Sequence, residues 1–192
     1  MLRSDDRDNE NVNARFFKPM LCLAVPKLPE GPDWQYELKL DGYRGIGIRC
    51  IGRAHLASRN GKEFSARFAT ITRALHQLPD ETVIDGEIVA VDGSGRPSFN
   101  LLQNFEIADA ILFYVFDLPI LAGTDLRSRP LEQRRALLRE LTEKLPDTLR
   151  FSESFDVTAS DLIDAVRRKA SKASWQSAAT APIDRAIAPA TG

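Results

Sequence analysis

The sequence predicts an α+β domain built from mostly antiparallel sheets with helices at their flanks. An Asp-Gly dipeptide at 41–42 separates two runs of strand-forming residues, 36–40 and 45–50, which is a strong signal for a tight antiparallel hairpin. Residues 110–118 form a near-continuous apolar run, as expected of a buried strand. Residues 64–78 carry apolar side chains three or four positions apart, the spacing of an amphipathic helix that packs on a sheet.

Composition places the chain among ordinary globular proteins. Its 192 residues are 43% apolar and 28% charged, which suits one domain with a core of its own. The net charge of −1 does not indicate general nucleic-acid binding, so a DNA site would have to be a local patch. Cys22 and Cys50 both lie among apolar residues and are expected to be free thiols in a reducing compartment.

Residues 1–15 are polar with mixed charges, which predicts a disordered lead-in and excludes a conventional signal peptide. The longest apolar run, 110–121, is interrupted by Asp117 and Pro119 and is too short to span a bilayer. The sequence therefore predicts a cytoplasmic protein that does not contact membranes.

An ionisable cluster is predicted next to the Asp-Gly turn. If residues 36–41 alternate as in a strand, Glu37, Lys39 and Asp41 lie on one face. A lysine held between two carboxylates in a pocket can lose its proton and act as a nucleophile, or it can contact a phosphate. The same pattern also suits a solvated surface hairpin, and spacing alone favours that interpretation.

The segments that follow are predicted to extend the sheet. Residues 54–58 form a strand that ends in an Arg-Asn-Gly-Lys turn at 59–62. Residues 82–91 form a further strand that contains Asp85 and Glu87. Charged groups inside an apolar strand are costly unless charge is needed there, so a functional role for this acidic pair is a fair alternative to a structural one.

The last predicted elements are a helix over 130–145, a strand over 149–153 and a helix over 160–168. Three arginines give the first of these helices a basic face: Arg134, Arg135 and Arg139. A charged helix face is usually solvated, which is the expectation here, with DNA contact as the alternative.

Four motifs in this order resemble those of ATP-dependent DNA ligases. They are Glu-Leu-Lys-Leu-Asp-Gly-Tyr-Arg at 37–44, Ser-Arg-Asn-Gly at 58–61, Asp-Gly-Glu at 85–87 and Phe-Tyr-Val-Phe-Asp-Leu at 113–118. The likeness is strongest to the adenylation domain of bacterial end-joining ligases. It implies an ATP-grasp-like nucleotidyltransferase fold, with ATP and Mg²⁺ (or Mn²⁺) as cofactors. It also implies nicked or broken double-stranded DNA as substrate, a nucleoid-associated location and a Ku-type end-binding protein as a candidate partner.

The resemblance also assigns roles to single residues. Lys39 would be the nucleophile that attacks the α-phosphate of ATP and becomes adenylated. The implied nucleotide contacts are Glu37 beside the adenine, Arg44 and Arg59 on ribose, phosphate or DNA, Glu87 near the ribose, and Phe116 stacked on the base. Glu87 and Asp41 are the candidate magnesium ligands, because Mg²⁺ prefers carboxylate oxygens close to phosphates.

Residues 169–192 do not continue the ligase pattern. The family next requires a Glu-Gly-x-x-x-Lys motif, a Trp-x-Lys-x-Lys motif and an OB-fold domain, whereas this stretch is rich in Ala and Ser and has no apolar period. A shifted reading frame starting at Lys169 permits Gly-Leu-Glu-Gly-Val-Val-Ala-Lys, which looks like the first missing motif. We therefore expect a partial adenylation domain over 16–168, incomplete at its C-terminus, and a frameshifted, disordered tail over 169–192. An OB-fold is expected to be absent, and sealing activity to be impaired.

Two other functions stay open. An RNA ligase or capping-type nucleotidyltransferase shares the Lys-x-Asp-Gly pattern at 39–42, although the Tyr-Arg that follows and the motif at 113–118 favour a DNA ligase. A non-catalytic nucleotide- or DNA-binding remnant would instead bind ATP without forming a covalent adduct on Lys39.

Overall fold

The computed structural model describes residues 12–21, 25, 29–31, 34–103, 110–155, 161, 164 and 186–187. The chain divides into two compact units. The first comprises Met1–Met20 and Asp41–Phe151, with Gly192, and the second comprises Leu21–Leu40 and Ser152–Thr191. None of the helices in the described part of the chain is long and apolar enough to cross a membrane.

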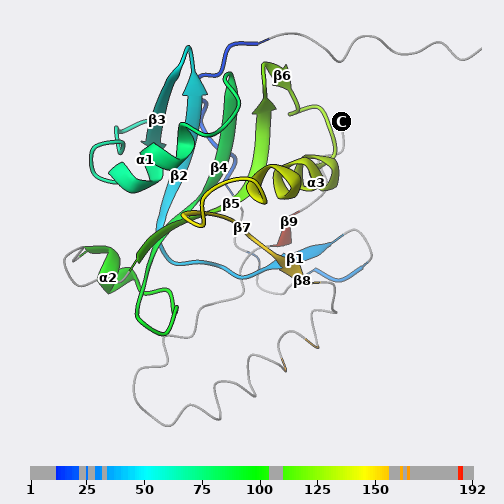
Figure 1. Cartoon of the computed structure of the whole chain (residues 1–192). Coiled ribbons are helices and arrows are strands. Elements are labelled where there is room, and N and C mark those ends of the chain that lie inside the picture. The colour runs from blue at the N-terminus through cyan, green and yellow to red at the C-terminus, as the bar shows by residue number, and fades with distance from the viewer. Residues whose placement is uncertain are drawn as a thin grey trace, which may run out of the picture. The chain divides into compact units, whose positions relative to one another are not determined.

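The first unit is built on a six-stranded sheet with the order β3-β2-β4-β5-β6, to which β7 adds beside β5 (Figure 1). Its strands are β2 (Tyr43–Cys50), β3 (Arg53–Ser58), β4 (Thr82–Val91), β5 (Ala110–Leu121), β6 (Thr124–Asp125) and β7 (Leu149–Phe151). The β5–β7 pair is parallel and the other pairs are antiparallel. The expectation of a mostly antiparallel sheet flanked by helices is therefore confirmed.

One face of this sheet carries the main core. Two helices, α1 (Ala69–Leu75) and α3 (Leu131–Thr142), lie on the same side of the sheet in Figure 1. Their buried side chains, among them Ile71 and Leu138, pack in one hydrophobic cluster with strand residues such as Phe113. A shorter helix, α2 (Phe99–Gln103), contributes Leu102 to the same cluster. Burial of this apolar surface is the main stabilising term for the unit.

The N-terminal segment packs in a second apolar cluster of the same unit. Ala14 is 4% exposed and packs with Ile46, Ile48 and other strand residues. The Val12 N–H donates a 2.7 Å hydrogen bond to the Gly123 carbonyl. The expectation of a disordered lead-in over 1–15 is therefore wrong for residues 12–15. This segment packs on apolar strand residues such as Ile46 and Ile48, and its polar composition does not indicate that contact.

Glu81 holds this N-terminal segment in place, and removing its side chain should destabilise the unit. Its carboxylate accepts hydrogen bonds from the Ala14 N–H and the Ile51 N–H. We expect Glu81→Ala to lower the free energy of unfolding by about 1–3 kcal/mol, because the Ala14 N–H loses its partner in a buried position. Urea denaturation followed by circular dichroism measures this. Asp80→Ala, which removes an exposed contact to the Gly52 N–H, is the control and should cost less than about 0.5 kcal/mol; equal losses would contradict the prediction.

The second unit contains a three-stranded sheet with the order β8-β1-β9. Its strands are β1 (Gln35–Glu37), β8 (Ser154–Phe155) and β9 (Ala186–Ile187). Both partners run antiparallel to the central strand. The Tyr36 hydroxyl donates a 2.7 Å hydrogen bond to the Pro29 carbonyl, which ties the central strand to the loop before it.

The predicted hairpin around the Asp-Gly dipeptide is wrong. β1 pairs with β8 and β9, whereas β2 pairs with β3 and β4, so the two runs belong to different sheets. The predicted alternation also ends early, since Tyr36 is 3% exposed but Leu38 is 48% exposed. The physical reason is that strands from distant parts of the chain compete successfully with the local turn signal.

Other predicted elements match in position but differ in length. β4 spans the predicted 82–91, β5 runs three residues beyond the predicted end, and α1 is confined to the centre of the predicted 64–78 helix. The predicted helix over 160–168 lies outside the described residues except for 161 and 164, which are helical. The predicted tail over 169–192 also lies outside them, apart from β9.

Candidate active site

The segment that carries the lysine motif lies in the second unit up to Leu40. Glu37 is the last residue of β1 and is 2% exposed, whereas Lys39 is exposed and lies just beyond the strand. A buried carboxylate next to an exposed amine differs from the predicted row of three charged groups on one strand face. Lys39 is therefore accessible to a phosphate, and Glu37 is held by the sheet.

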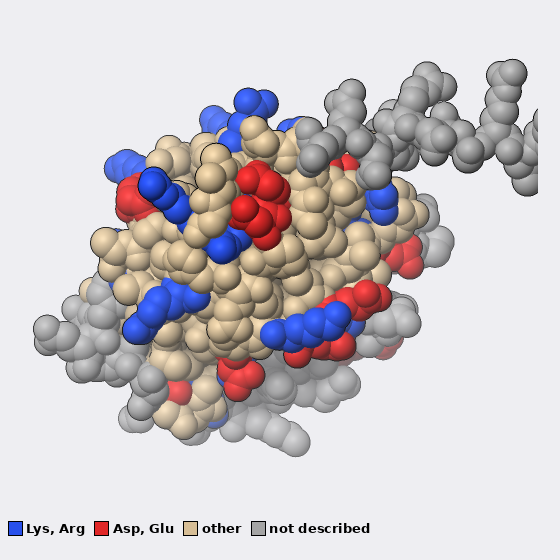
Figure 2. Space-filling model, turned by 45° about the horizontal axis from the view of Figure 1, so that its top comes forward, with Lys and Arg blue, Asp and Glu red and all other residues tan. Residues whose placement is uncertain are grey.

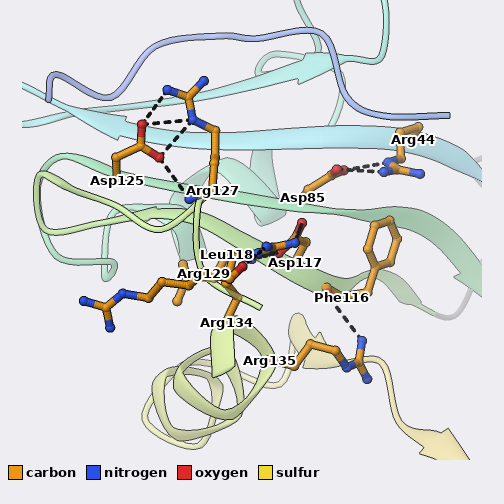
Figure 3. A network of polar contacts seen from close by, with 10 residues as sticks. All are labelled: Arg44, Asp85, Phe116, Asp117, Leu118, Asp125, Arg127, Arg129, Arg134 and Arg135. Atoms are coloured by element: carbon orange, nitrogen blue, oxygen red, sulfur yellow. Dashed lines mark hydrogen bonds and ion pairs between the residues drawn. The ribbon is translucent and has the colours of Figure 1, made fainter. Parts of the chain in front are cut away.

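An arginine–carboxylate pair forms the centre of the site in the first unit. Arg44 on β2 donates from Nε and Nη2 to the two oxygens of Asp85 on β4, at 2.6 and 2.7 Å (Figure 3). The two side chains are 11% and 5% exposed. The pairing register brings them together, because Arg44 lies opposite Glu87, two residues along β4 from Asp85. A bidentate pair of this kind is strongly directional, since both hydrogen bonds must form in one plane.

The Arg44 guanidinium also covers an aromatic ring. Its Cζ lies 4.4 Å from the centroid of the Phe116 ring, a cation–π contact between β2 and β5. Glu87 lies directly opposite Arg44 on one side and Tyr114 on the other in the sheet register. Three of the predicted nucleotide contacts, Arg44, Glu87 and Phe116, therefore come from three neighbouring strands of one sheet.

Two glycines of the motifs occupy positions with no room for a side chain. A Cβ at Gly42 would lie 2.1 Å from the Ile88 carbonyl oxygen, and one at Gly86 would lie 2.4 Å from the Tyr114 carbonyl oxygen. Backbone atoms cannot move aside as flexible side chains can. These glycines therefore allow the close approach of strands that brings Arg44 and Asp85 together.

Phe116 and Asp117 form an irregular step in β5. Asp85 pairs with Asp117 and Gly86 with Val115, so the register of β4 skips Phe116. A β-bulge of this kind re-aims a side chain and interrupts the ladder of backbone hydrogen bonds. The carbonyl of Phe116 accepts a 3.1 Å hydrogen bond from Arg135 Nη1.

The basic face predicted for α3 is solvated only in part. Arg134 and Arg135 are 7% and 4% exposed and point toward β5 (Figure 3). Arg139 is exposed, and its Cζ lies 4.4 Å from the centroid of the Phe151 ring. The prediction of a solvated face is therefore wrong for the first two arginines, and their burial also excludes direct DNA contact in this conformation. Both have carbonyl or carboxylate partners, which is what makes a buried guanidinium tolerable.

Arg59 is a predicted contact of the first unit that the structure does not join to this cluster. It lies in the turn after β3, where the Ser58 hydroxyl accepts a 3.1 Å hydrogen bond from the Lys62 N–H. Its side chain is exposed and makes no hydrogen bond or ion pair with any residue in the described ranges. An exposed arginine on a tight turn is available to a phosphate from outside the chain.

The described residues contain no group of three or more acidic, His or Cys side chains that could by themselves hold a metal ion. The predicted magnesium ligands, Asp41 and Glu87, are an exposed residue and a half-buried one. Mg²⁺ is commonly held by one or two carboxylates together with substrate phosphates, so a single carboxylate such as Glu87 fits a site completed by a nucleotide.

Charge on the surface is mixed rather than segregated. On the face shown in Figure 2, lysine and arginine side chains of the described residues are interspersed with aspartate and glutamate. This face carries no broad basic patch among those residues, in keeping with the net charge of −1.

Sequence reasoning did not assign to the site four charged residues that the structure places around Phe116. They are Asp85, Asp117, Arg134 and Arg135. A signal for the two aspartates exists, because a carboxylate inside an apolar strand needs a partner. No local signal identifies the arginines as partners of β5, since α3 follows that strand only after a further turn and strand.

Comparison with known proteins identifies relatives for most of the chain. The family model for the ATP dependent DNA ligase domain matches residues 19–175. The multifunctional non-homologous end joining protein LigD of Pseudomonas aeruginosa is 42% identical over 150 residues, which cover 76% of this chain and 18% of that protein. LigD of Mycolicibacterium smegmatis is 33% identical over 140 residues, covering 71% and 18%. The chain thus spans less than a fifth of the length of these two relatives.

Solved structures give the same assignment. The ligase domain of M. tuberculosis LigD is 30% identical, with a TM-score of 0.63, and the match covers 73% of this chain and 47% of that one. A mycobacterial DNA ligase D complexed with ATP and MES is 28% identical, again with a TM-score of 0.63, covering 73% and 46%. Sequence and structural comparison therefore both relate the chain to DNA ligases.

Proposed function

Because this chain belongs to the ATP-dependent DNA ligase family, we propose that it binds ATP and accepts AMP on Lys39. The family assignment rests on the domain match over 19–175 and is stronger support for a DNA ligase than for an RNA ligase or capping enzyme. The observation that carries the proposal is the cluster of Arg44, Asp85 and Phe116, which gathers three separate motifs at one place in the sheet.

The first step of the proposed reaction is a nucleophilic substitution at phosphorus. The neutral Lys39 amine attacks the α-phosphate of ATP, a P–N bond forms, and the bond to pyrophosphate breaks as pyrophosphate leaves. In the later steps AMP passes to a DNA 5′-phosphate, and the 3′-hydroxyl of the nick displaces it. The exposed position of Lys39 beyond β1 supports this role, because the amine must reach a substrate phosphate.

The remaining predicted residues are assigned to binding. Phe116 supplies a flat apolar ring, but it is 6% exposed and the Arg44 guanidinium covers it, so stacking on the adenine requires Arg44 to move aside. Glu87 would accept from the ribose hydroxyls. Glu37, which is 2% exposed, would contact the base only if the end of β1 opens when ATP binds. Arg59 is assigned to phosphate or the DNA end, for which its exposed guanidinium is suited.

Mg²⁺ is expected to neutralise the triphosphate and stabilise the departing pyrophosphate when bound. Glu87 is the better of the two candidate ligands, because it lies in the sheet opposite Arg44, while Asp41 is exposed. Both oxygens of such a carboxylate are hard donors of the kind the ion prefers.

Mass spectrometry of the purified chain tests the proposal. We expect a covalent AMP adduct on Lys39 after incubation with ATP and Mg²⁺, and complete loss of the adduct in Lys39→Ala, because no other group can replace the attacking amine. Lys62→Ala, which removes an exposed lysine elsewhere, is the matched control and should keep the adduct. Equilibrium binding of ATP with no adduct in the unmodified chain would instead select the non-catalytic alternative.

We further propose that the substrate is nicked or broken double-stranded DNA and that a Ku-type protein recruits the ligase to DNA ends. The P. aeruginosa and M. smegmatis relatives are named as non-homologous end joining proteins, which supports this assignment. Pull-down of a Ku homologue on DNA ends tests the partner.

Residues 169–192 are proposed to be out of frame with the ligase domain, and the purified chain of 192 residues is then expected to seal nicks poorly. The Glu-Gly-x-x-x-Lys pattern does not occur in this stretch, and groups that stabilise charge at a reacting phosphate typically contribute orders of magnitude in rate. Resequencing the codons from Ala165 onward tests the frame. Robust nick sealing by this chain would overturn the expectation.

A further inference from the structure

Two buried arginines on α3 have no role in the proposed reaction. Arg134 and Arg135 are 7% and 4% exposed, although arginine is almost never buried without specific partners. Their charge predicts that both lie on the solvated side of the helix. Their partners therefore indicate what the burial achieves.

Both arginines bind the same short segment of β5. Arg134 Nε and Nη2 donate to the two carboxylate oxygens of Asp117 at 2.7 and 3.1 Å, and its Nη1 donates to the Arg129 carbonyl. Arg135 Nη1 donates to the carbonyl of Phe116 at 3.1 Å. The Arg135 Cζ also lies 4.8 Å from the centroid of the Phe151 ring, which fixes the direction of the guanidinium.

The β5 segment that the two arginines bind is also where the pairing between β4 and β5 is irregular. The register between β4 and β5 shifts on either side of Asp85, and the shift between Asp85 and Gly86 leaves Phe116 without a paired residue on β4. A residue in a β-bulge is not held by the regular backbone hydrogen bonds that fix the orientation of the other residues in the strand. The hydrogen bond from Arg135 to its carbonyl and the ion pair from Arg134 to the next residue supply that constraint from the helix side.

The ring of Phe116 is also held from the β2 side. Arg44 contacts it while bound to Asp85, the cross-strand partner of Asp117. Asp85 and Asp117 are thus neighbours in the sheet, and each is bound by an arginine through two hydrogen bonds. The Arg44–Asp85 pair lies beside the Phe116 ring, and the Arg134–Asp117 pair holds the next residue of β5 (Figure 3).

We propose that Arg134 and Arg135 are positioning residues that set the orientation of the Phe116 ring for stacking on the adenine of ATP. The proposal rests on the proposed function, in which Phe116 binds the base. It extends the nucleotide site to a helix that none of the four motifs includes. It also explains why two guanidinium groups are buried beneath an irregular step in a strand.

Binding measurements with and without a base test the proposal. We expect Arg135→Met and Arg134→Met each to weaken ATP binding about tenfold, the scale of one lost base-stacking contact, and to leave the binding of inorganic tripolyphosphate unchanged. Phe116→Leu should weaken ATP binding to the same extent. The double variant Phe116→Leu/Arg135→Met should then be no weaker than Phe116→Leu, because both changes remove the same interaction.

Two control variants separate positioning from stability. Leu138→Ala, on the buried face of the same helix, lowers stability without removing a polar contact to β5, and should leave the ratio of ATP to tripolyphosphate affinity unchanged. Arg127→Met removes a bidentate pair with Asp125 elsewhere in the unit and should do the same. An affinity ratio that falls equally in Leu138→Ala and Arg135→Met would overturn the proposal.

Hydrogen exchange gives a readout that does not need the nucleotide. Arg135→Met and Arg134→Met should speed amide exchange at residues 116–118 more than Leu138→Ala does. If the unmodified chain fails to bind ATP, the proposed function fails, and exchange alone then decides whether the arginines order the bulge. If the unmodified chain binds ATP and both arginine variants bind it equally well, only the positioning role is overturned.

Discussion

Replacing Asp85 with alanine is expected to lower the free energy of unfolding by about 3–5 kcal/mol. The substitution leaves the Arg44 guanidinium, whose side chain is 11% exposed, without the carboxylate that accepts two of its hydrogen bonds. Removing one partner of a buried pair costs this much because the remaining charge stays desolvated. Urea denaturation followed by circular dichroism, with Asp85→Ala beside the unmodified chain, measures the loss.

The exposed pair of Asp125 and Arg127 provides the matched control. It has the same bidentate chemistry, but the Arg127 side chain is 56% exposed. Asp125→Ala should therefore cost less than about 1 kcal/mol, the usual worth of a surface pair. The double variant Arg44→Met/Asp85→Ala should recover part of the loss, since it removes both charges of this pair. A cost for Asp85→Ala no larger than that for Asp125→Ala would contradict the assignment of a buried pair.

The second large effect is expected at Gly86. A Cβ there would lie 2.4 Å from the Tyr114 carbonyl oxygen and 2.7 Å from the Phe113 ring, so Gly86→Ala forces β4 and β5 apart. We expect a loss of about 3 kcal/mol or more, at or beyond the upper end for overpacked cores, because the nearest obstacle is backbone. The same separation should weaken ATP binding, since β4 carries Asp85 and β5 carries Phe116.

Gly95 is the control for this substitution. It has a positive φ of 76°, and a Cβ placed on it would meet no atom within 4 Å, so Gly95→Ala introduces conformational strain but no clash. Its expected cost is about 1 kcal/mol, from the left-handed backbone alone. Thermal unfolding of the two variants compares them directly. Equal shifts in Tm would show that close strand approach at Gly86 is not what requires a glycine.

The arginines of α3 show where sequence reasoning reaches its limit. The sequence predicts a helix from 130 to 145, and α3 occupies Leu131–Thr142. It does not predict the face that is buried, because charged residues normally mark the solvated side. Arg134 and Arg135 face inward because Asp117 and the Phe116 carbonyl accept their hydrogen bonds there. The burial of these two arginines is therefore determined by acceptor groups on β5 and not by the sequence of the helix.

Local sequence is enough to specify the long central strands and the identity of the motif residues. β4 and β5 form strands because long runs of mostly apolar residues favour burial on both faces of a sheet, and such runs can be recognised in the sequence alone. The order and spacing of the motifs are likewise enough to indicate the ligase family. These properties can be recognised without knowing which segments meet.

The pairing of the strands, by contrast, depends on contacts between segments that are far apart in the chain. The Asp-Gly dipeptide predicts a hairpin, but β1 takes β8 and β9 as partners and β2 takes β3 and β4. Composition predicts disorder for residues 12–15, yet Ala14 packs against an apolar cluster of strand residues. In each case the deciding contact joins residues far apart in the chain. A strand's partners and a buried charge's counterion depend on which distant segments compete for the same surface, and no local pattern records that competition.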